Sequence, residues 1–145
     1  MDAAVVDVEA LVVAYLMGQP TRPPGTVVAT QVPRAKTGEV AFPPRMIRVG
    51  RTGGAMFSPA HDRPTILVEC WSAGSTAAWA LAGWARRAML ALYDTLVEVT
   101  VDGAPHAAFL SHRAEGSGPV NLPDPATTMP RYQFMHELQV RGAHD

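Results

Sequence analysis

A period-two pattern near the C-terminus constrains the fold of this chain more than any other feature. Over eleven residues, a mostly apolar set of side chains alternates with a mostly polar set. The apolar set is Tyr132, Phe134, His136, Leu138 and Val140, and the set between and beside them is Arg131, Gln133, Met135, Glu137, Gln139 and Arg141. Successive side chains of a strand point to opposite faces, so the pattern predicts a β-strand with one buried and one largely solvated face. Such a strand favours antiparallel neighbours.

Two segments have the composition of helices. Residues 3–17 predict an amphipathic helix that Gly18 and Pro20 end, with one apolar face made of Val5, Val8, Val12, Tyr15 and Leu16. Residues Ser72–Leu96 are rich in Ala and Leu and predict a long helix that Ser72 or Ser75 caps. This second helix is apolar on two adjoining sides and charged only along a narrow band. A helix of this kind is usually covered on more than one side, and a partner subunit is the natural cover.

Further strands are expected at Thr26–Val32, at Arg45–Arg51 with Ile47 and Val49 inward, and at Thr65–Trp71. The last of these is almost continuously apolar and is therefore expected to lie centrally. A short strand at Val97–Val101 turns at Asp102-Gly103 into His106–His112, and long loops follow from the Gly and Pro content of residues 33–44, 52–64 and 114–130. The expectation is one α+β domain over residues 1–145. It has a curved, mixed, mostly antiparallel sheet of about five strands and two main helices, in the order helix, three strands, helix, two or three strands.

The amino-acid composition of the chain limits the kinds of macromolecule that it is expected to bind. The chain has 145 residues, 48% hydrophobic and 17% charged, with a net charge of -1, and soluble domains average about 25% charged. The excess of apolar residues requires a large core or a second chain to cover it. A near-neutral domain is not expected to bind nucleic acid through its phosphates. The basic residues concentrate between Arg22 and Arg63, where two acids face seven cations, and this stretch could dock on an acidic neighbour.

The sequence contains no membrane span and no basic leader, so it is expected to fold in a cytosol. Its single cysteine, Cys70, excludes an internal disulfide and a cysteine-based zinc site. None of the five histidines has a recognised ligand spacing, and Gly50–Gly54 is not followed by the Lys-Ser or Lys-Thr of a phosphate-binding loop. No metal, no cofactor and no membrane contact are expected.

The search for catalytic residues finds only one weak pattern. Ser72, with Cys70 and Gly74 on either side, imitates a nucleophile elbow. Either of two acids (Asp94, Asp102) and any of three histidines (His106, His112, His136) would complete it, and nothing selects among them. Helix capping explains Ser72 better, and the chain is not expected to be an enzyme.

Several segments together carry a family resemblance. They are the first helix with its Tyr15-Leu16 ending, the strand that ends Ile47-Arg48-Val49-Gly50-Arg51-Thr52-Gly53-Gly54, the strand Arg63–Trp71, the Ala-rich helix, and the aromatic ending Pro130–Gly142. In these the chain resembles the small tail terminator (tail completion) proteins of long-tailed bacteriophages and prophages. The resemblance implies an α/β subunit in a hexameric ring. Such a ring binds the last ring of the major tail tube protein, stops its polymerisation, and presents a surface to the head-completion or neck protein. DNA passes through its lumen, it has no enzymatic activity, and it resides in the virion after assembly in the host cytoplasm.

Two sets of residues follow as candidates. The subunit-interface candidates are Trp79, Trp84, Arg86, Arg87, Met89 and Tyr93, and the docking-loop candidates are Arg34, Lys36, Arg45, Arg51 and Phe57. Three alternatives stay open. They are another phage neck component, such as a head-closure or head-tail connector protein, a small serine hydrolase using Ser72, and a ligand-binding or regulatory homo-oligomer unrelated to phages.

Overall fold

The structure is a computed structural model that describes residues 2–3 and 6–143. Val5 of the predicted first helix and His144 lie outside the described residues. The elements in chain order are α1 (Val8–Met17), β1 (Thr26–Ala29), β2 (Arg45–Gly53), β3 (Met56–Ser58), β4 (His61–Asp62), β5 (Thr65–Ser72), α2 (Ser75–Leu90), β6 (Thr95–Val101), β7 (Ala104–Asn121) and β8 (Arg131–Gly142).

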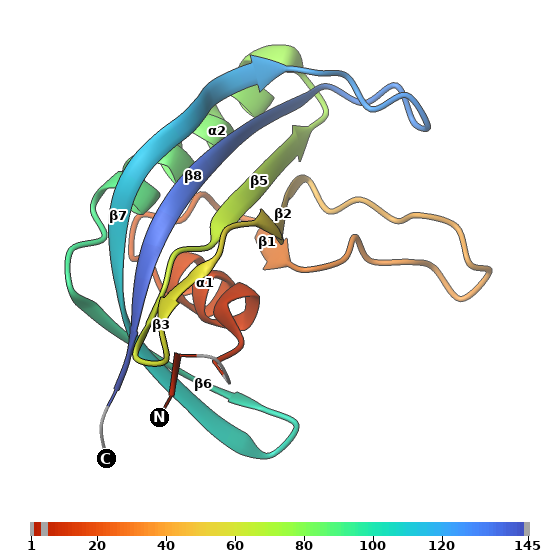
Figure 1. Ribbon diagram of the computed structural model, residues 1–145. Coiled ribbons are helices and arrows are strands. Elements are labelled where there is room, and N and C mark those ends of the chain that lie inside the picture. Colours follow the sequence, from red (N-terminus) through yellow and green to blue (C-terminus); the bar gives the residue numbers. More distant parts are fainter. Residues whose placement is uncertain (1, 4–5, 144–145) are drawn as a thin grey trace.

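One curved sheet contains all the strands, and β8 organises it (Figure 1). On one side β8 pairs with β5 and then with β4, and on the other it pairs with β7, whose far edge carries β6. The β1–β2 pair is parallel, and every other pairing is antiparallel. This confirms an α+β fold with two helices on a mixed, mostly antiparallel sheet. The sheet has eight strands instead of about five, because β3 and β4 form a hairpin inside the predicted loop 52–64.

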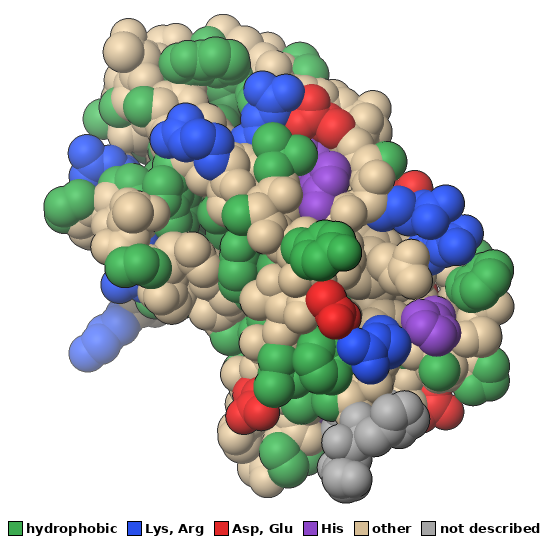
Figure 2. Space-filling model, turned by 90° about the vertical axis from the view of Figure 1, so that its left-hand side faces the viewer, with side chains coloured by type: hydrophobic (Ala, Val, Ile, Leu, Met, Phe, Trp, Pro, Cys, Tyr) green, Lys and Arg blue, Asp and Glu red, His purple; other side chains and the backbone are tan. Residues whose placement is uncertain are grey.

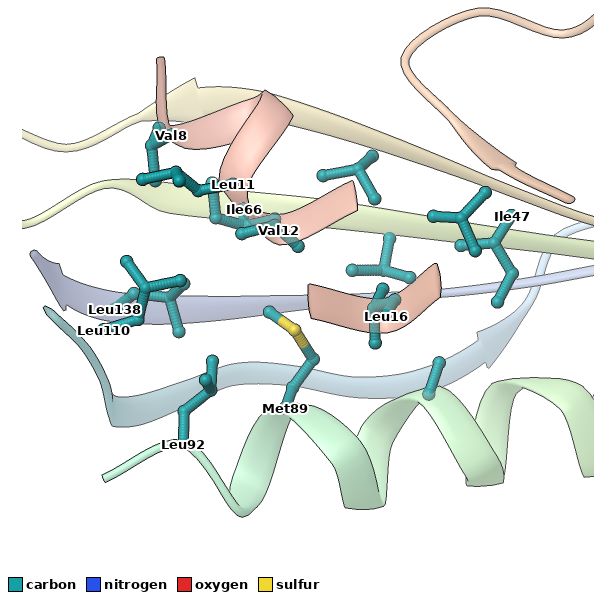
Figure 3. Packing of buried hydrophobic residues seen from close by; sticks show 14 of the residues in the cluster. Val8, Leu11, Val12, Leu16, Ile47, Ile66, Met89, Leu92, Leu110 and Leu138 are labelled. Carbon is teal, nitrogen blue, oxygen red and sulfur yellow. The ribbon is translucent and has the colours of Figure 1, made fainter. Parts of the chain in front are cut away.

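Both helices lie on the same face of the sheet and share its core (Figure 3). The helix α1 buries Val8, Leu11, Val12 and Leu16 against the strands. The Tyr15 hydroxyl of α1 donates to the carbonyl oxygen of Ala88 in α2 at 2.6 Å, which joins the two helices directly. The predicted alternation of β8 is confirmed, because Phe134, His136, Leu138 and Val140 are buried while the residues between them are partly exposed.

The predicted helix ends were wrong in three places. The first helix begins at Val8, where the Asp7 carboxylate accepts a hydrogen bond from the Ala10 amide at 3.0 Å. The second begins at Ser75, because Ser72 still pairs with Arg45 as the last residue of β5 and the N-cap is Gly74. It ends at Leu90, because the chain turns through Asp94 (φ 46°) to bury Leu92 and enter β6 at Thr95.

The predicted loop 114–130 is a strand over almost its first half, to Asn121. β7 continues to Asn121 against β8, although this part contains two glycines and a proline. The pairing register shifts three times between His112 and Val120, and these irregularities accommodate the glycines and the proline. A bulged residue is left unpaired, so its amide does not have to donate a hydrogen bond to the neighbouring strand. The opposite error concerns β1, which ends at Ala29 and not at Val32.

Candidate functional site

The outer face of α2 carries large apolar side chains that are exposed to solvent. Trp79 and Leu90 are 50% and 46% exposed, and Tyr93 in the following turn is 87% exposed. We call these three residues the outer strip. Trp79, Gly83, Arg87 and Leu90 recur at helical spacing, so they line one side of α2. With Arg86 and Pro119 of β7 they border a groove of about 380 Å³.

The six interface candidates divide between two sides of α2. Trp84 and Met89 lie in the core, 7% and 0% exposed, and the Trp84 indole nitrogen donates to the Thr21 hydroxyl at 3.0 Å. Their side chains are already covered within one chain and present little surface to a second. Trp79, Arg86, Arg87 and Tyr93 face outward, and Trp79 stands edge-on to the Tyr132 ring at 5.3 Å. One apolar side of α2 therefore packs into the core, and another side carries Trp79 and Leu90 of the outer strip.

A charged cluster lies beside the groove and ties α2 to β7 and β8. Arg86 donates two hydrogen bonds to the Glu115 carboxylate, both at 2.7 Å, and the same carboxylate lies 2.9 Å from Nε2 of His136. The His112 ring stands edge-on to His136 at 4.5 Å. Nδ1 of His136 and Nε2 of His112 are buried without a hydrogen-bond partner. The sequence pattern placed His136 on the buried face, but it missed Glu115 because that residue fell in a predicted loop.

The cluster lowers the pKa of its carboxyl group and of both imidazoles, which favours the charged carboxylate and the neutral imidazoles. The hydrogen bonds from Arg86, with a smaller contribution from His136, lower the pKa of Glu115 from 4.5 to about 2. Burial lowers the pKa of His136, although its hydrogen bond to Glu115 acts the other way, and burial also lowers the pKa of His112. At neutral pH the cluster is therefore an Arg-carboxylate ion pair beside two neutral imidazoles.

This arrangement predicts a loss of stability in mild acid. The unfolded chain takes up protons on both histidines below their ordinary pKa of 6.5, whereas the folded chain resists this protonation. The free energy of unfolding should therefore fall as the pH drops below about 6.5, by up to about 1.4 kcal/mol per pH unit for each such proton. A further fall begins below 4.5, where the unfolded chain protonates Glu115 and the folded chain does not. Urea denaturation at a series of pH values measures both.

The matched variant is His136→Gln, whose amide can still donate to Glu115. It should make the fall in the free energy of unfolding below about pH 6.5 smaller, because His112 is then the one histidine of the cluster that still contributes. An unchanged slope in this variant would contradict the assignment to His136.

The docking-loop candidates Arg34 and Lys36 lie on a long projection between β1 and β2. All of residues 33–41 are exposed, and we call this segment the arm. The arm is a small hairpin, in which the Ala35 amide donates to the Glu39 carbonyl at 2.7 Å and the Ala41 amide donates to the Pro33 carbonyl at 2.8 Å. Figure 1 shows it leaving the body in the same direction as the loop 122–130.

The base of the arm is held against the outer face of the sheet by Trp71. Phe42 packs on the Trp71 ring at 5.4 Å, and the Trp71 indole nitrogen donates to the Asp124 carboxylate at 3.2 Å. Both long loops are thus fixed to one residue of β5. A groove of about 390 Å³ separates them, bordered by Arg34, Val40, Phe42 and Asp124 among others.

The remaining docking-loop candidates differ in whether their side chains are free to contact another protein. Arg45 donates to the carbonyl oxygen of Pro24 at 2.6 Å. Arg51 is fully engaged within the chain, because its guanidinium donates to both carboxylate oxygens of Asp62 at 2.5 and 2.9 Å. Phe57 is 65% exposed in strand β3 of the β3–β4 hairpin, with the Arg63 guanidinium 4.3 Å from its ring. Arg51 therefore holds this hairpin in place, while Phe57 is presented to solvent.

The structure gives Ser72 a structural role. Its buried hydroxyl donates to the carbonyl oxygen of Pro44 at 3.2 Å, so it neither caps α2 nor adjoins an imidazole. Two of the proposed partners are engaged elsewhere, since Asp94 pairs with Arg141 and Nδ1 of His106 accepts from the Asp7 amide. Burial raises the pKa of the Cys70 thiol far above its usual range. Within the described residues, no three His, Cys, Asp or Glu side chains are placed to hold a metal ion.

Comparison with known proteins identifies the family to which the chain belongs. None of the curated proteins matches the chain. Neither α1 nor α2 is long and apolar enough to cross a membrane, and no other helix occurs among the described residues. A family model described as phage tail termination protein matches residues 4–144, which is almost the whole sequence. The chain therefore belongs to the phage tail termination protein family, as its sequence pattern suggested, and it is a component of a phage tail.

Proposed function

We propose that this protein assembles into a ring, hexameric as the family resemblance implies, that caps the tail tube and ends its polymerisation. The ring then provides the surface for joining the head, and DNA passes through its lumen. The outer strip is the observation that carries this proposal. The exposed tryptophan and leucine on one side of α2, with the exposed tyrosine in the turn that follows, are apolar surface that a second copy could cover.

A ring also needs a second, different surface on each subunit, because its contacts are head-to-tail. Figure 2 views the side of the molecule that lies at the left of Figure 1, where β7 and the connection from α2 to β6 run. Hydrophobic side chains form patches there between arginines and carboxylates. The arm and the loop 122–130 project from a different side, to the right in Figure 1. The subunit thus has one face with hydrophobic patches among charged side chains and, away from it, projecting loops.

The arm, the loop 122–130 and the β3–β4 hairpin supply contacts to the tube and the neck. Phe57 and Met56 of the β3–β4 hairpin, 65% and 49% exposed, suit a partly apolar partner surface. Loops fixed to a rigid sheet can present such residues without any change in the core. On this proposal the protein resides at the head-proximal end of the virion tail, after assembly in the host cytoplasm, and performs no catalysis.

Electron microscopy of the purified protein, alone and mixed with its tail tube protein, tests the function. The expected result is rings at tube ends and tubes that stop growing once capped. A protein that binds only the head-side neck proteins would favour the alternative of a head-closure or connector component. A protein that never engages tube ends would overturn the proposal.

Substitution of the outer strip should prevent ring assembly without unfolding the subunit. In the double variant Leu90→Asp/Tyr93→Asp both changed side chains are exposed, so the core stays intact. Burying two carboxylates in an apolar contact should weaken subunit association by at least about tenfold. Native mass spectrometry measures the ring population. The matched control is Met56→Asp, an equally exposed residue of another element, which should leave the ring mass unchanged.

A further inference from the structure

The arm is ordered by its own hydrogen bonds and not by the body of the subunit. Its nine residues, 33–41, are all exposed. The Arg34 guanidinium bonds within the arm, to the Gly38 carbonyl at 2.8 Å, and neither Arg34 nor Lys36 forms an ion pair with any described residue. A segment that buries nothing in its own chain contributes little to folding, which points to a partner.

The charge around the arm is unevenly distributed. The arm contains Arg34 and Lys36 against one acid, Glu39, and residues 10–32 contain Arg22 and no acidic residue. The opposite composition occurs in residues 95–112, which form β6 and the first half of β7. They contain Glu98 and Asp102 and neither Lys nor Arg. Both acids are exposed, and neither forms an ion pair with a described residue.

The acidic segment also has a free strand edge. Among the described residues β6 pairs only with β7, so its other edge lacks a neighbouring strand over Thr95–Val101. Five of these seven residues are Thr or Val, and Leu96 is 48% exposed. An open edge of this length is a template for an extended segment of another chain unless something covers it.

We propose that the arm of one subunit docks on the outer edge of β6 of the next subunit, with Arg34 and Lys36 against Glu98 and Asp102. The occupant of the β6 edge is thus residues 33–41 of a second copy. This inference rests on the proposed ring and names its contact. The arm and β6 lie on different parts of the subunit (Figure 1), so the contact is head-to-tail and propagates around a ring. β6 begins two residues after Tyr93 of the outer strip.

Charge reversal tests the contact. The acidic-arm variant is Arg34→Glu/Lys36→Glu, and the basic-edge variant is Glu98→Lys/Asp102→Asn, where asparagine keeps the φ of 48° at position 102 favourable. Each variant alone places like charges against each other and should weaken association, measured by native mass spectrometry at low salt, by at least about tenfold. An equimolar mixture should regain association, because each variant then meets an opposite charge on both sides. Arg22→Glu, a matched charge reversal outside the arm, should associate as the unaltered protein does.

Hydrogen exchange tests the strand edge independently. Amides of residues 95–101 should exchange more slowly in the assembled protein than in the acidic-arm variant, while those of β5 should not differ. Association unchanged in both variants, a mixture that gains nothing, or a wild-type chain that stays monomeric at about 1 mM would each overturn the contact. Tube ends capped equally by all variants would overturn the contact but leave the function standing. If association changes with the charges as expected but the protein does not cap tube ends, the contact stands and the proposed function is overturned.

Discussion

Phe134→Ala should lower the free energy of unfolding by about 3–5 kcal/mol. Phe134 lies in β8, between its pairings with β5 and with β7, and is 1% exposed within the shared core. Truncation removes the whole buried phenyl ring and leaves a cavity that two flanking strands prevent from collapsing. Urea denaturation with circular dichroism at pH 7 measures the change.

The control for this substitution is Phe57→Ala. Phe57 has the same side chain but is 65% exposed, and its contact within the chain is with the Arg63 guanidinium and the His61 ring. Its loss should cost about 1 kcal/mol or less. Similar effects at the two positions would mean that β8 is not the centre of the core.

Gly54→Ala should have the second large effect, a destabilisation of about 3 kcal/mol or more. Gly54 joins β2 to β3 with φ +92°, a conformation that side chains rarely adopt. A Cβ at this position would lie 2.0 Å from the Arg63 carbonyl oxygen and 2.8 Å from the Pro64 Cα. These are backbone atoms, so relief requires moving the chain that leads into β5.

Gly53→Ala provides a neighbouring control, because a Cβ at Gly53 meets nothing within 4 Å and its φ is not positive. It should leave stability within about 0.5 kcal/mol. Thermal unfolding of the two variants side by side measures the difference. If both glycines accept alanine equally, the tight β2–β3 turn is not required for the fold.

The elements with sustained periodicity were predictable. The alternation from Tyr132 to Val140 identified β8 and its buried face, and the apolar run at Thr65–Trp71 identified a central strand. Where the prediction was wrong, pairing with a strand distant in the sequence determined the local structure, although the local composition favoured another. The strand β7 runs through Gly116 and Pro119 because β8 offers a partner along this length, and Ser72 remains a strand residue because Arg45 pairs with it.

The candidate surfaces were only partly predictable for a related reason. Composition showed that the second helix had more apolar surface than one side needs, but it could not tell which side the core would take. Trp84 and Met89 went inward and Trp79 outward. Likewise Arg51 belonged to the same basic stretch as Lys36, yet only the folded chain brings Asp62 to it.

The sequence by itself determined the fold class, the two helices, the central strands and the family, because periodicity and composition act within a local window. The tertiary structure decided which charges are free. It paired Arg51 and Arg86 with acids from other elements, and among the residues that the structure describes it gave Lys36 and Glu98 no such partner. Ion pairing depends on which distant segments the sheet brings together, and one-dimensional spacing does not specify that.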